Sequence, residues 1–162
     1  MNVLFDINVV LDIVGNRLPF YGDSHAALLK TVEIGATPML AMHAFPTLYY
    51  LLGSVETRAV RVELMEWIFE TFGVAEEGVS ELSAARSSGI NDFEDALVAA
   101  AAVSVGCDCI ITRNIKDFAG SPVRAISPTD FLKEKNVVGG MTAVNLAPSL
   151  QSSAMKKTKL RT

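Results

Sequence analysis

Short apolar runs alternate along the chain with longer segments whose apolar residues recur at helical spacing. The short runs are "NVLFD", "TPMLAM", "CDCIIT" and "VRAIS". Between them, segments such as Val55–Gly73 place apolar residues three or four positions apart. Strands that read as continuous apolar runs, separated by helices, are typical of a parallel sheet covered on both faces. The pattern therefore predicts an α/β fold with a central, mostly parallel sheet.

Capping residues mark the expected ends of the helices. Asp23 or Ser24 is expected to begin a helix that ends at Gly35. Gly73 is expected to close the helix that starts near Val55. Four further helices are predicted in the segments "AFPTLYYLLGS", "VSELSAARSSG", Asn91–Gly106 and "SPTDFLKEK".

The character of the chain changes after about Lys135. The 162 residues suit one domain. Residues 1–135 carry all the predicted strands and helices, whereas residues 136–162 are rich in Gly, Ser and Pro and end in a cluster of basic residues. We expect a folded domain over 1–135 and a C-terminal tail over 136–162 that is disordered or bound to a partner.

Composition narrows the cellular setting and the partners. Half of the residues are hydrophobic, which argues against general disorder, and the net charge is -4, so nucleic-acid binding would need a local basic patch. Cys107 and Cys109 lie two apart in a predicted strand, where no disulfide is expected. No signal peptide and no apolar run of the ~18 residues that span a membrane is found. The sequence predicts a cytoplasmic protein with no membrane contact.

Acidic and amide side chains follow the predicted strands or begin the helix between them. Asp6 ends the first strand, and Asn114 follows "CDCIIT". Asp92 and Asp95 lie three apart in the first turn of a helix, so they share a face. Ligands of parallel α/β sheets bind beyond the carboxyl ends of the strands, so these groups are expected to converge there. Clustered carboxylates favour a Mg²⁺ or Mn²⁺ ion.

Each of these residues also has a purely structural interpretation. Asn91 and Glu94 fit a capping box, and acids in a first turn interact favourably with the helix dipole. These effects account for Asp92 and Glu94 but less well for Asp95, which leads into the apolar face. Asp6 and Asp117 alone fit simple turn caps, as Thr112 and Asn114 fit loop positions.

Three motifs together resemble the PIN-domain family over most of residues 1–133. They are "VLFDINVVLD", "DFEDALVAAAA" and "IITRNIKDF", in this order. Among small members, the chain resembles VapC-type toxin ribonucleases of toxin–antitoxin pairs. The resemblance implies a three-layer α/β/α sandwich, a Mg²⁺ or Mn²⁺ site of clustered acids, and endonucleolytic cleavage of single-stranded RNA. It also implies a possible antitoxin partner, and a homodimer is expected.

The resemblance assigns roles to particular residues. It implies Asp6, Asp95 and Asp92 as metal ligands and catalytic residues. Asn114 falls on a further site position with Asp117 close by, and Asn8 matches a polar position near the site. Arg113 and Lys116 lie beside these residues in the sequence and are predicted to contact RNA phosphates, with solvated surface charge as the alternative.

One departure from the family pattern concerns the helix after the second strand. The family usually has a glutamate at its start, but no acid occurs from Met39 to Gly53. Thr47 and His43 are the nearest neutral groups that can replace it, directly or through water. For His43 a core or capping role is the favoured interpretation.

Two other functions remain open from the residues. "DINVV" is similar to the nucleophile motif of haloacid-dehalogenase-type phosphatases, in which Asp6 would attack phosphorus. Asn8 stands where that class needs a general acid, and the strand ending at Thr112 follows the acidic helix instead of preceding it. The second alternative is a catalytically impaired PIN-fold module that binds nucleic acid or protein, which the missing glutamate favours.

Overall fold

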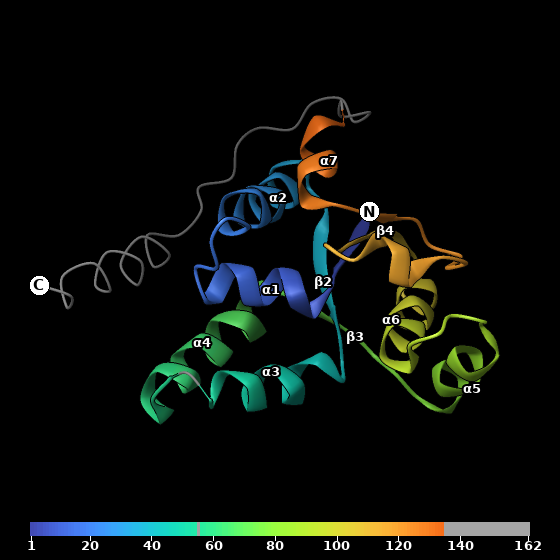
Figure 1. The fold of residues 1–162 in the computed structure, drawn as a ribbon, viewed down its shortest axis with the longest axis horizontal. Coiled ribbons are helices and arrows are strands. Elements are labelled where there is room, and N and C mark those ends of the chain that lie inside the picture. The colour runs from blue at the N-terminus through green and yellow to red at the C-terminus, as the bar shows by residue number, and fades with distance from the viewer. Residues whose placement is uncertain (55, 135–162) are drawn as a thin grey trace, which may run out of the picture.

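A five-stranded parallel sheet forms the middle layer of the computed structural model, which describes residues 1–54 and 56–134 (Figure 1). The strand order is β3-β2-β1-β4-β5. All four neighbouring pairs of strands are parallel. The strands are β1 (Asn2–Phe5), β2 (Thr37–Ala41), β3 (Gly73–Ala75), β4 (Cys107–Ile111) and β5 (Ala125–Ile126).

Helices cover both faces of this sheet. One face carries the helices α5 and α6, and the other carries α1–α4 and α7 (Figure 1). The helices are α1 (Ile7–Val14), α2 (Tyr21–Glu33), α3 (Ala44–Leu52), α4 (Arg58–Thr71), α5 (Val79–Ser87), α6 (Phe93–Ser104) and α7 (Pro128–Lys133), and the 3-10 helix η1 is Ile115–Phe118. The expected α/β/α sandwich is confirmed. None of the described helices is long and apolar enough to cross a membrane.

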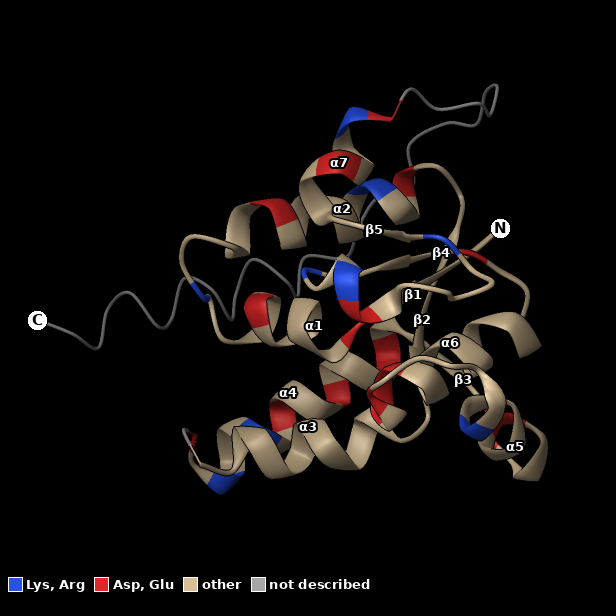
Figure 2. Ribbon diagram, turned by 45° about the vertical axis from the view of Figure 1, so that its right-hand side comes forward, with Lys and Arg blue, Asp and Glu red and all other residues tan. Residues whose placement is uncertain are grey.

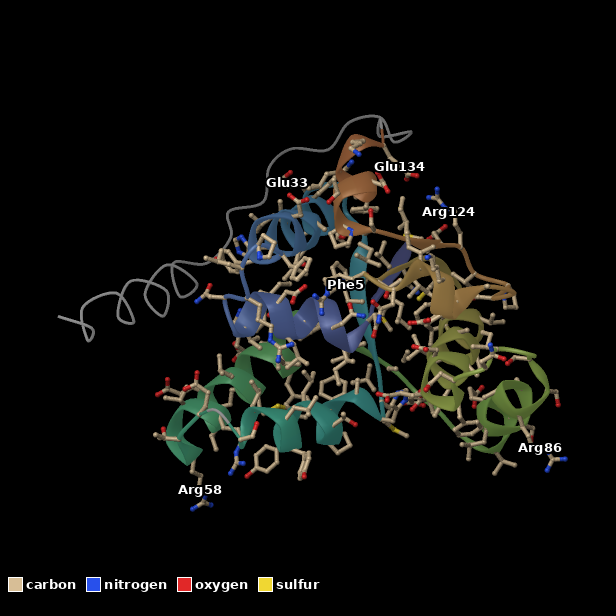
Figure 3. All side chains as sticks on the ribbon, in the orientation of Figure 1. Phe5, Glu33, Arg58, Arg86, Arg124 and Glu134 are labelled. Carbon is tan, nitrogen blue, oxygen red and sulfur yellow. The ribbon has the colours of Figure 1, made fainter. Side chains whose placement is uncertain are left out.

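Strand β1 lies at the centre of the sheet and of the core. Val3, Leu4 and Phe5 have no exposed surface. The Phe5 ring points into the interior (Figure 3) and meets the edge of the Phe72 ring at a centroid distance of 5.5 Å. Because both neighbours of β1 hydrogen-bond to it, the residue that follows Phe5 is held at a fixed place on the carboxyl edge of the sheet.

Three boundaries differ from those the sequence predicted. The apolar run after Asp6 forms the separate helix α1. Helix α2 begins at Tyr21, ahead of Asp23 and Ser24, and the Ser24 hydroxyl is fully buried against the Asp12 carboxylate instead of capping a helix. Gly73 does not cap α4 but opens the short edge strand β3, which the sequence analysis missed.

The predicted C-terminal tail, 136–162, lies outside the described residues. The two cysteines, for which no disulfide was expected, are free and buried in β4. Burial raises the pKa of the Cys107 thiol to about 12 and that of Cys109 to about 11, so both are neutral thiols at physiological pH.

Small side chains allow α6 to lie close to the sheet, and this packing yields a stability prediction. Ala101 is fully buried, whereas Ala100 is only partly buried and borders a groove. We expect Ala101→Leu to lower the free energy of unfolding by about 1–3 kcal/mol, because the larger side chain overpacks the core. Ala100→Leu should cost clearly less in the same urea titration. Equal costs at the two positions would contradict this packing.

Candidate active site

Asp6 is the buried carboxylate at the carboxyl end of β1. Its side chain is 5% exposed, and its backbone N–H donates to the Ile111 carbonyl of β4 at 2.9 Å. The Thr112 hydroxyl donates to Asp6 Oδ2 at 2.6 Å, and Asn8 Nδ2 donates to the same oxygen at 2.5 Å. Two donors from different elements therefore fix the orientation of this carboxylate.

The same hydrogen bonds join the ends of β1 and β4. Asn8 Oδ1 accepts from the Arg113 backbone N–H at 3.3 Å, and Thr112 Oγ1 accepts from the Asn114 backbone N–H at 2.9 Å. Thr112 is fully buried, whereas Asn114 is exposed at the start of η1. The loop after β4 is thus held beside Asp6, although 106 residues separate Thr112 from it.

Helix α6 begins at the same edge of the sheet. Asp92, rather than the expected Asn91, is its N-cap, and Asp92 Oδ1 accepts from the backbone N–H groups of Glu94 at 2.8 Å and Asp95 at 3.3 Å. The predicted capping box is therefore wrong. Because one Asp92 oxygen serves the backbone, this residue has a structural role whatever else it does.

The acids at this edge act electrostatically on one another. Partial burial, followed by the negative charges of Asp6, Asp92, Asp117 and Glu94, raises the pKa of Asp95 from 3.8 to about 6. Acidic segments gather near the starts of α1 and α6 (Figure 2). The structure thus brings together Asp6, Asp92, Asp95 and Asp117, which come from three separate sequence motifs.

Burial is also the main reason why the pKa of Asp6 is raised. The Thr112 hydroxyl and the backbone amides of Asn8 and Ile7 lower it, and the Glu94 charge raises it. Asp6 and Asp95 therefore both stand in surroundings that oppose their ionised forms. A bound cation would favour those forms.

The donor set of the cluster fits a hard divalent cation, since it consists of carboxylate oxygens with unbalanced negative charge. However, no group of three or more His, Cys, Asp or Glu side chains in the described part of the chain is already arranged to hold a metal ion. Asp6, Asp95 and Asp92 are the residues of this cluster that would hold such an ion.

The two basic residues predicted to contact RNA lie in different surroundings. Arg113 Nε is 3.1 Å from Asp12 Oδ2, and its guanidinium lies over the Phe20 ring at 4.3 Å. Arg113 Nε makes no hydrogen bond within the described residues, so the contact is an ion pair. Arg113 thus has structural partners in α1 and at the start of α2, whereas Lys116 is exposed in η1.

Sequence reasoning missed two acids with structural consequences. Asp12 is fully buried, and burial raises its pKa while Arg113 lowers it. Glu77, which follows β3, accepts from the His43 backbone N–H at 2.9 Å and lies 2.7 Å from His43 Nδ1. Thr47 is engaged with its own helix, since its hydroxyl donates to the His43 carbonyl at 3.0 Å. No sequence motif signalled the Glu77 contact, because it depends on the missed strand β3.

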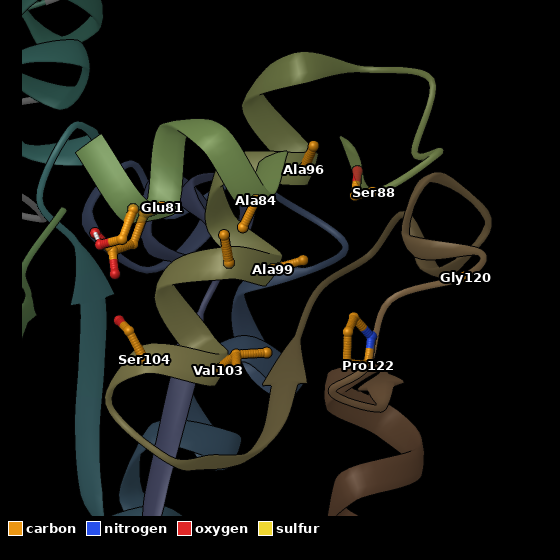
Figure 4. A pocket seen from close by; sticks show the side chains of 11 residues that line it. Glu81, Ala84, Ser88, Ala96, Ala99, Val103, Ser104, Gly120 and Pro122 are labelled. Atoms are coloured by element: carbon orange, nitrogen blue, oxygen red, sulfur yellow. Dashed lines mark hydrogen bonds between the residues drawn. The ribbon is translucent and has the colours of Figure 1, made fainter. Parts of the chain in front are cut away.

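A separate groove of about 430 Å³ lies between α5, α6 and the loop containing Gly120 and Pro122 (Figure 4). Small residues such as Ala84, Ala99 and Val103 line it. None of the clustered acids is among its lining residues. The groove therefore does not belong to the acidic site.

The parallel sheet flanked by helices defines an α/β protein. The carboxylates at the carboxyl edge of the sheet are suited to a divalent cation. The sequence over residues 2–116 matches the family model of the PIN domain. The chain belongs to the PIN-domain family. A search of curated proteins gives no match.

Solved structures share this fold at low sequence identity. VapBC2 from Rickettsia felis, bound to a promoter DNA fragment, is 14% identical with a TM-score of 0.61, over 78% of this chain and 98% of that one. A toxin–antitoxin complex from Klebsiella pneumoniae is 20% identical with a TM-score of 0.62, over 78% and 97% of the two chains. PAE2754 from Pyrobaculum aerophilum is 16% identical with a TM-score of 0.54, over 82% and 88%. These likenesses establish the fold.

The partial burial of Asp95, together with repulsion by the neighbouring acids, predicts a pH-dependent effect on stability. Because the folded-state pKa is about 6 and the ordinary value is 3.8, ionised Asp95 destabilises the fold, and this cost develops as the pH rises from about 4 to about 6. In chelator, Asp95→Asn should raise the free energy of unfolding at pH 7 by about 1 kcal/mol, after allowance for solvent screening of a partly exposed group.

Urea titrations of wild type and Asp95→Asn at pH 3.5 and pH 7 test this effect. The difference between the two proteins should be much smaller at pH 3.5, where Asp95 is protonated in the folded chain and mostly protonated in the unfolded chain. A variant that is less stable than wild type at pH 7 would contradict the repulsion among these carboxylates.

Proposed function

We propose that this chain is a divalent-metal-dependent endoribonuclease that cleaves single-stranded RNA and acts as the toxin of a toxin–antitoxin pair. The observation that carries the proposal is the convergence of Asp6, Asp92, Asp95 and Asp117 at the carboxyl edge of the sheet. Membership of the PIN-domain family supports a nuclease. The toxin–antitoxin complexes among the similar structures support the biological class.

Each group at the site has a proposed task. A bound Mg²⁺ or Mn²⁺ ion supplies an activated water and stabilises charge on the phosphate. Asp6, Asp95 and Asp92 hold the ion, and Asn8 and Thr112 keep Asp6 in its orientation. Asn114 and Asp117, at the beginning of η1, orient the attacking water or a metal ligand. Lys116 binds an RNA phosphate from its exposed position, and Arg113 adds positive charge beside the site.

A second candidate is a PIN-fold module that binds nucleic acid or protein without cleaving it. Two observations favour it: the lack of an acid from Met39 to Gly53, and the absence of a preassembled metal cage among the described residues. The family match favours the nuclease class over the phosphatase alternative. RNA cleavage separates the two remaining candidates.

Cleavage of a single-stranded RNA in Mn²⁺ tests the proposed activity. Wild type should cut the RNA, and chelator should abolish cutting. Asp95→Asn should lower the rate by about 100-fold or more, because it removes a proposed ligand of the ion that would stabilise charge on the phosphate. Glu63→Gln, which changes an exposed acid on α4, is the matched control and should retain wild-type activity.

Two results would contradict the ribonuclease assignment. One is a folded wild-type protein that leaves RNA intact in both Mg²⁺ and Mn²⁺. The other is cutting that persists equally in chelator and in Asp95→Asn, because a contaminating nuclease would then explain it.

An apolar surface on α3 and α4 is the proposed contact for a protein partner. Tyr50 is 79% exposed and Phe69 is 59% exposed, and the Phe69 ring stacks on Phe45 at a centroid distance of 4.7 Å. Tyr49, Leu51 and Val62 add to the exposed apolar side chains of these two helices. We assign this surface, defined by these six residues, to a homodimer contact or to an apolar helix of an antitoxin.

Sedimentation over a range of protein concentrations tests the dimer. We expect a monomer–dimer equilibrium that Tyr50→Ser shifts toward monomer, because the tyrosine contributes apolar contact area. Val79→Ser, on α5, removes an equally exposed apolar side chain elsewhere and should not change the equilibrium. A wild-type protein that stays monomeric at all concentrations would exclude the homodimer.

A further inference from the structure

His43 and Glu77 form a partly buried pair next to the acidic cluster. Glu77 contacts His43 through both carboxylate oxygens. Oε2 accepts from the His43 backbone N–H at 2.9 Å, and Oε1 lies 2.7 Å from the ring atom Nδ1. The Glu77 side chain is 5% exposed and that of His43 is 21% exposed. The imidazole ring therefore has one fixed orientation.

The contact with Glu77 leaves the other ring nitrogen, Nε2, without a hydrogen bond in the part of the chain that the structure describes. An ionised carboxylate only accepts hydrogen bonds, so Nδ1 donates to Glu77. In the tautomer that fits this contact, the lone pair of the ring lies on Nε2. Nε2 is buried and makes no hydrogen bond within the described structure. The closest ionisable atom to it is Glu94 Oε1 at 3.9 Å, which is too far for a hydrogen bond.

Two electron-pair donors thus face each other across a short gap. A lone pair on Nε2 and a carboxylate oxygen both gain from a positive charge between them. A histidine that donates one ring N–H to a carboxylate and leaves the other nitrogen bare is the usual arrangement of a metal-ligating histidine. In this arrangement His43 corresponds to the residue that binds the metal ion, and Glu77 to the carboxylate that orients the ring.

The location of the pair connects it to the proposed metal site. His43 lies just beyond the end of β2, which neighbours β1 and therefore Asp6. Glu94 lies next to Asp95 in the first turn of α6, and its carboxylate is 3.9 Å from His43 Nε2, so it connects His43 to the acidic start of that helix. His43 also lies within the stretch from Met39 to Gly53 that contains no acid.

We propose that His43 Nε2 is a ligand of the metal centre in this chain, with Glu94 beside it and Glu77 as the residue that positions the ring. The proposal rests on the proposed function, because it concerns the same metal site. It makes the ligand set a mixture of imidazole nitrogen and carboxylate oxygen. Imidazole suits Mn²⁺ and later transition metals better than Mg²⁺, so the site should select Mn²⁺ over Mg²⁺.

Pulsed electron paramagnetic resonance of Mn²⁺ bound to the 162-residue chain tests the ligand directly. Wild type should show the nitrogen-14 modulation of a coordinated imidazole, and His43→Gln should lose it. His25→Gln is the matched control, because His25 is the other of the two histidines and stacks on Tyr21 in α2. It should keep the signal.

Calorimetric binding of Mn²⁺ and Mg²⁺ gives a second readout. His43→Gln should weaken Mn²⁺ binding by about 10-fold or more and change Mg²⁺ binding much less, so that the metal preference disappears. Glu77→Gln should keep the nitrogen signal but weaken Mn²⁺ binding by about 10-fold, as for the loss of a group that orients a ligand.

Each outcome decides the proposal. Mn²⁺ that binds without a nitrogen signal, or with the same signal in His43→Gln, overturns it, and so does a wild type that binds no Mn²⁺. The RNA cleavage assay with Asp95→Asn is independent of these spectra. A centre that binds through carboxylates alone and still cuts RNA would reject His43 as a ligand and leave the ribonuclease proposal standing.

Discussion

Repulsion among carboxylates at one edge of the sheet is the physical constraint that organises this molecule. Asp6 cannot move away from the others, because it follows a central strand and two donors hold one of its oxygens. Asp95 cannot move far either, since it belongs to the first turn of a helix whose next residues are buried. Partial burial of Asp95 and the nearby negative charges therefore act together, and they raise the pKa of Asp95 to about 6.

The rest of the structure can be understood as support for this edge. The parallel sheet aligns the ends of β1 and β4, and Asn8 and Thr112 connect them with hydrogen bonds. Small residues on α6 allow that helix to approach the sheet, and Asp92 caps it where the acids meet. Where β2 and β3 end, the contact between Glu77 and His43 joins the two segments that follow these strands. Functional sites often contain unfavourable interactions that lower the stability of the fold and are maintained by the surrounding structure.

Much of this arrangement could be predicted from the sequence, because strand ends and helix caps are local signals. The alternation of apolar runs and helices predicted the parallel sheet, and the positions of Asp6, Asp95 and Asn114 relative to those elements predicted their convergence. The short strand β3 was missed, since three residues, Gly73–Ala75, carry no periodicity. The choice of Asp92 over Asn91 as N-cap was also beyond the sequence, because both residue types cap helices equally well.

The Glu77–His43 contact shows the limit of local reasoning more clearly. Its two residues are 34 apart and lie in different connections, and only the pairing of β2 with β3 brings them together. The sequence analysis favoured a core or capping role for His43. His43 does occupy the N-cap position of α3, but among the described residues its side chain caps no backbone group and lies between Glu77 and Glu94. Similarly, the buried Asp12 gives Arg113 a partner that no motif indicated.

Titration of Asp95 by nuclear magnetic resonance, without metal and with saturating Mg²⁺, tests the central claim most directly. The account predicts a pKa near 6 in the metal-free protein. It also predicts a clear fall in that pKa when Mg²⁺ is added, because a bound cation favours the ionised carboxylate. A pKa near the ordinary 3.8 that Mg²⁺ does not change would contradict both the repulsion and the metal site.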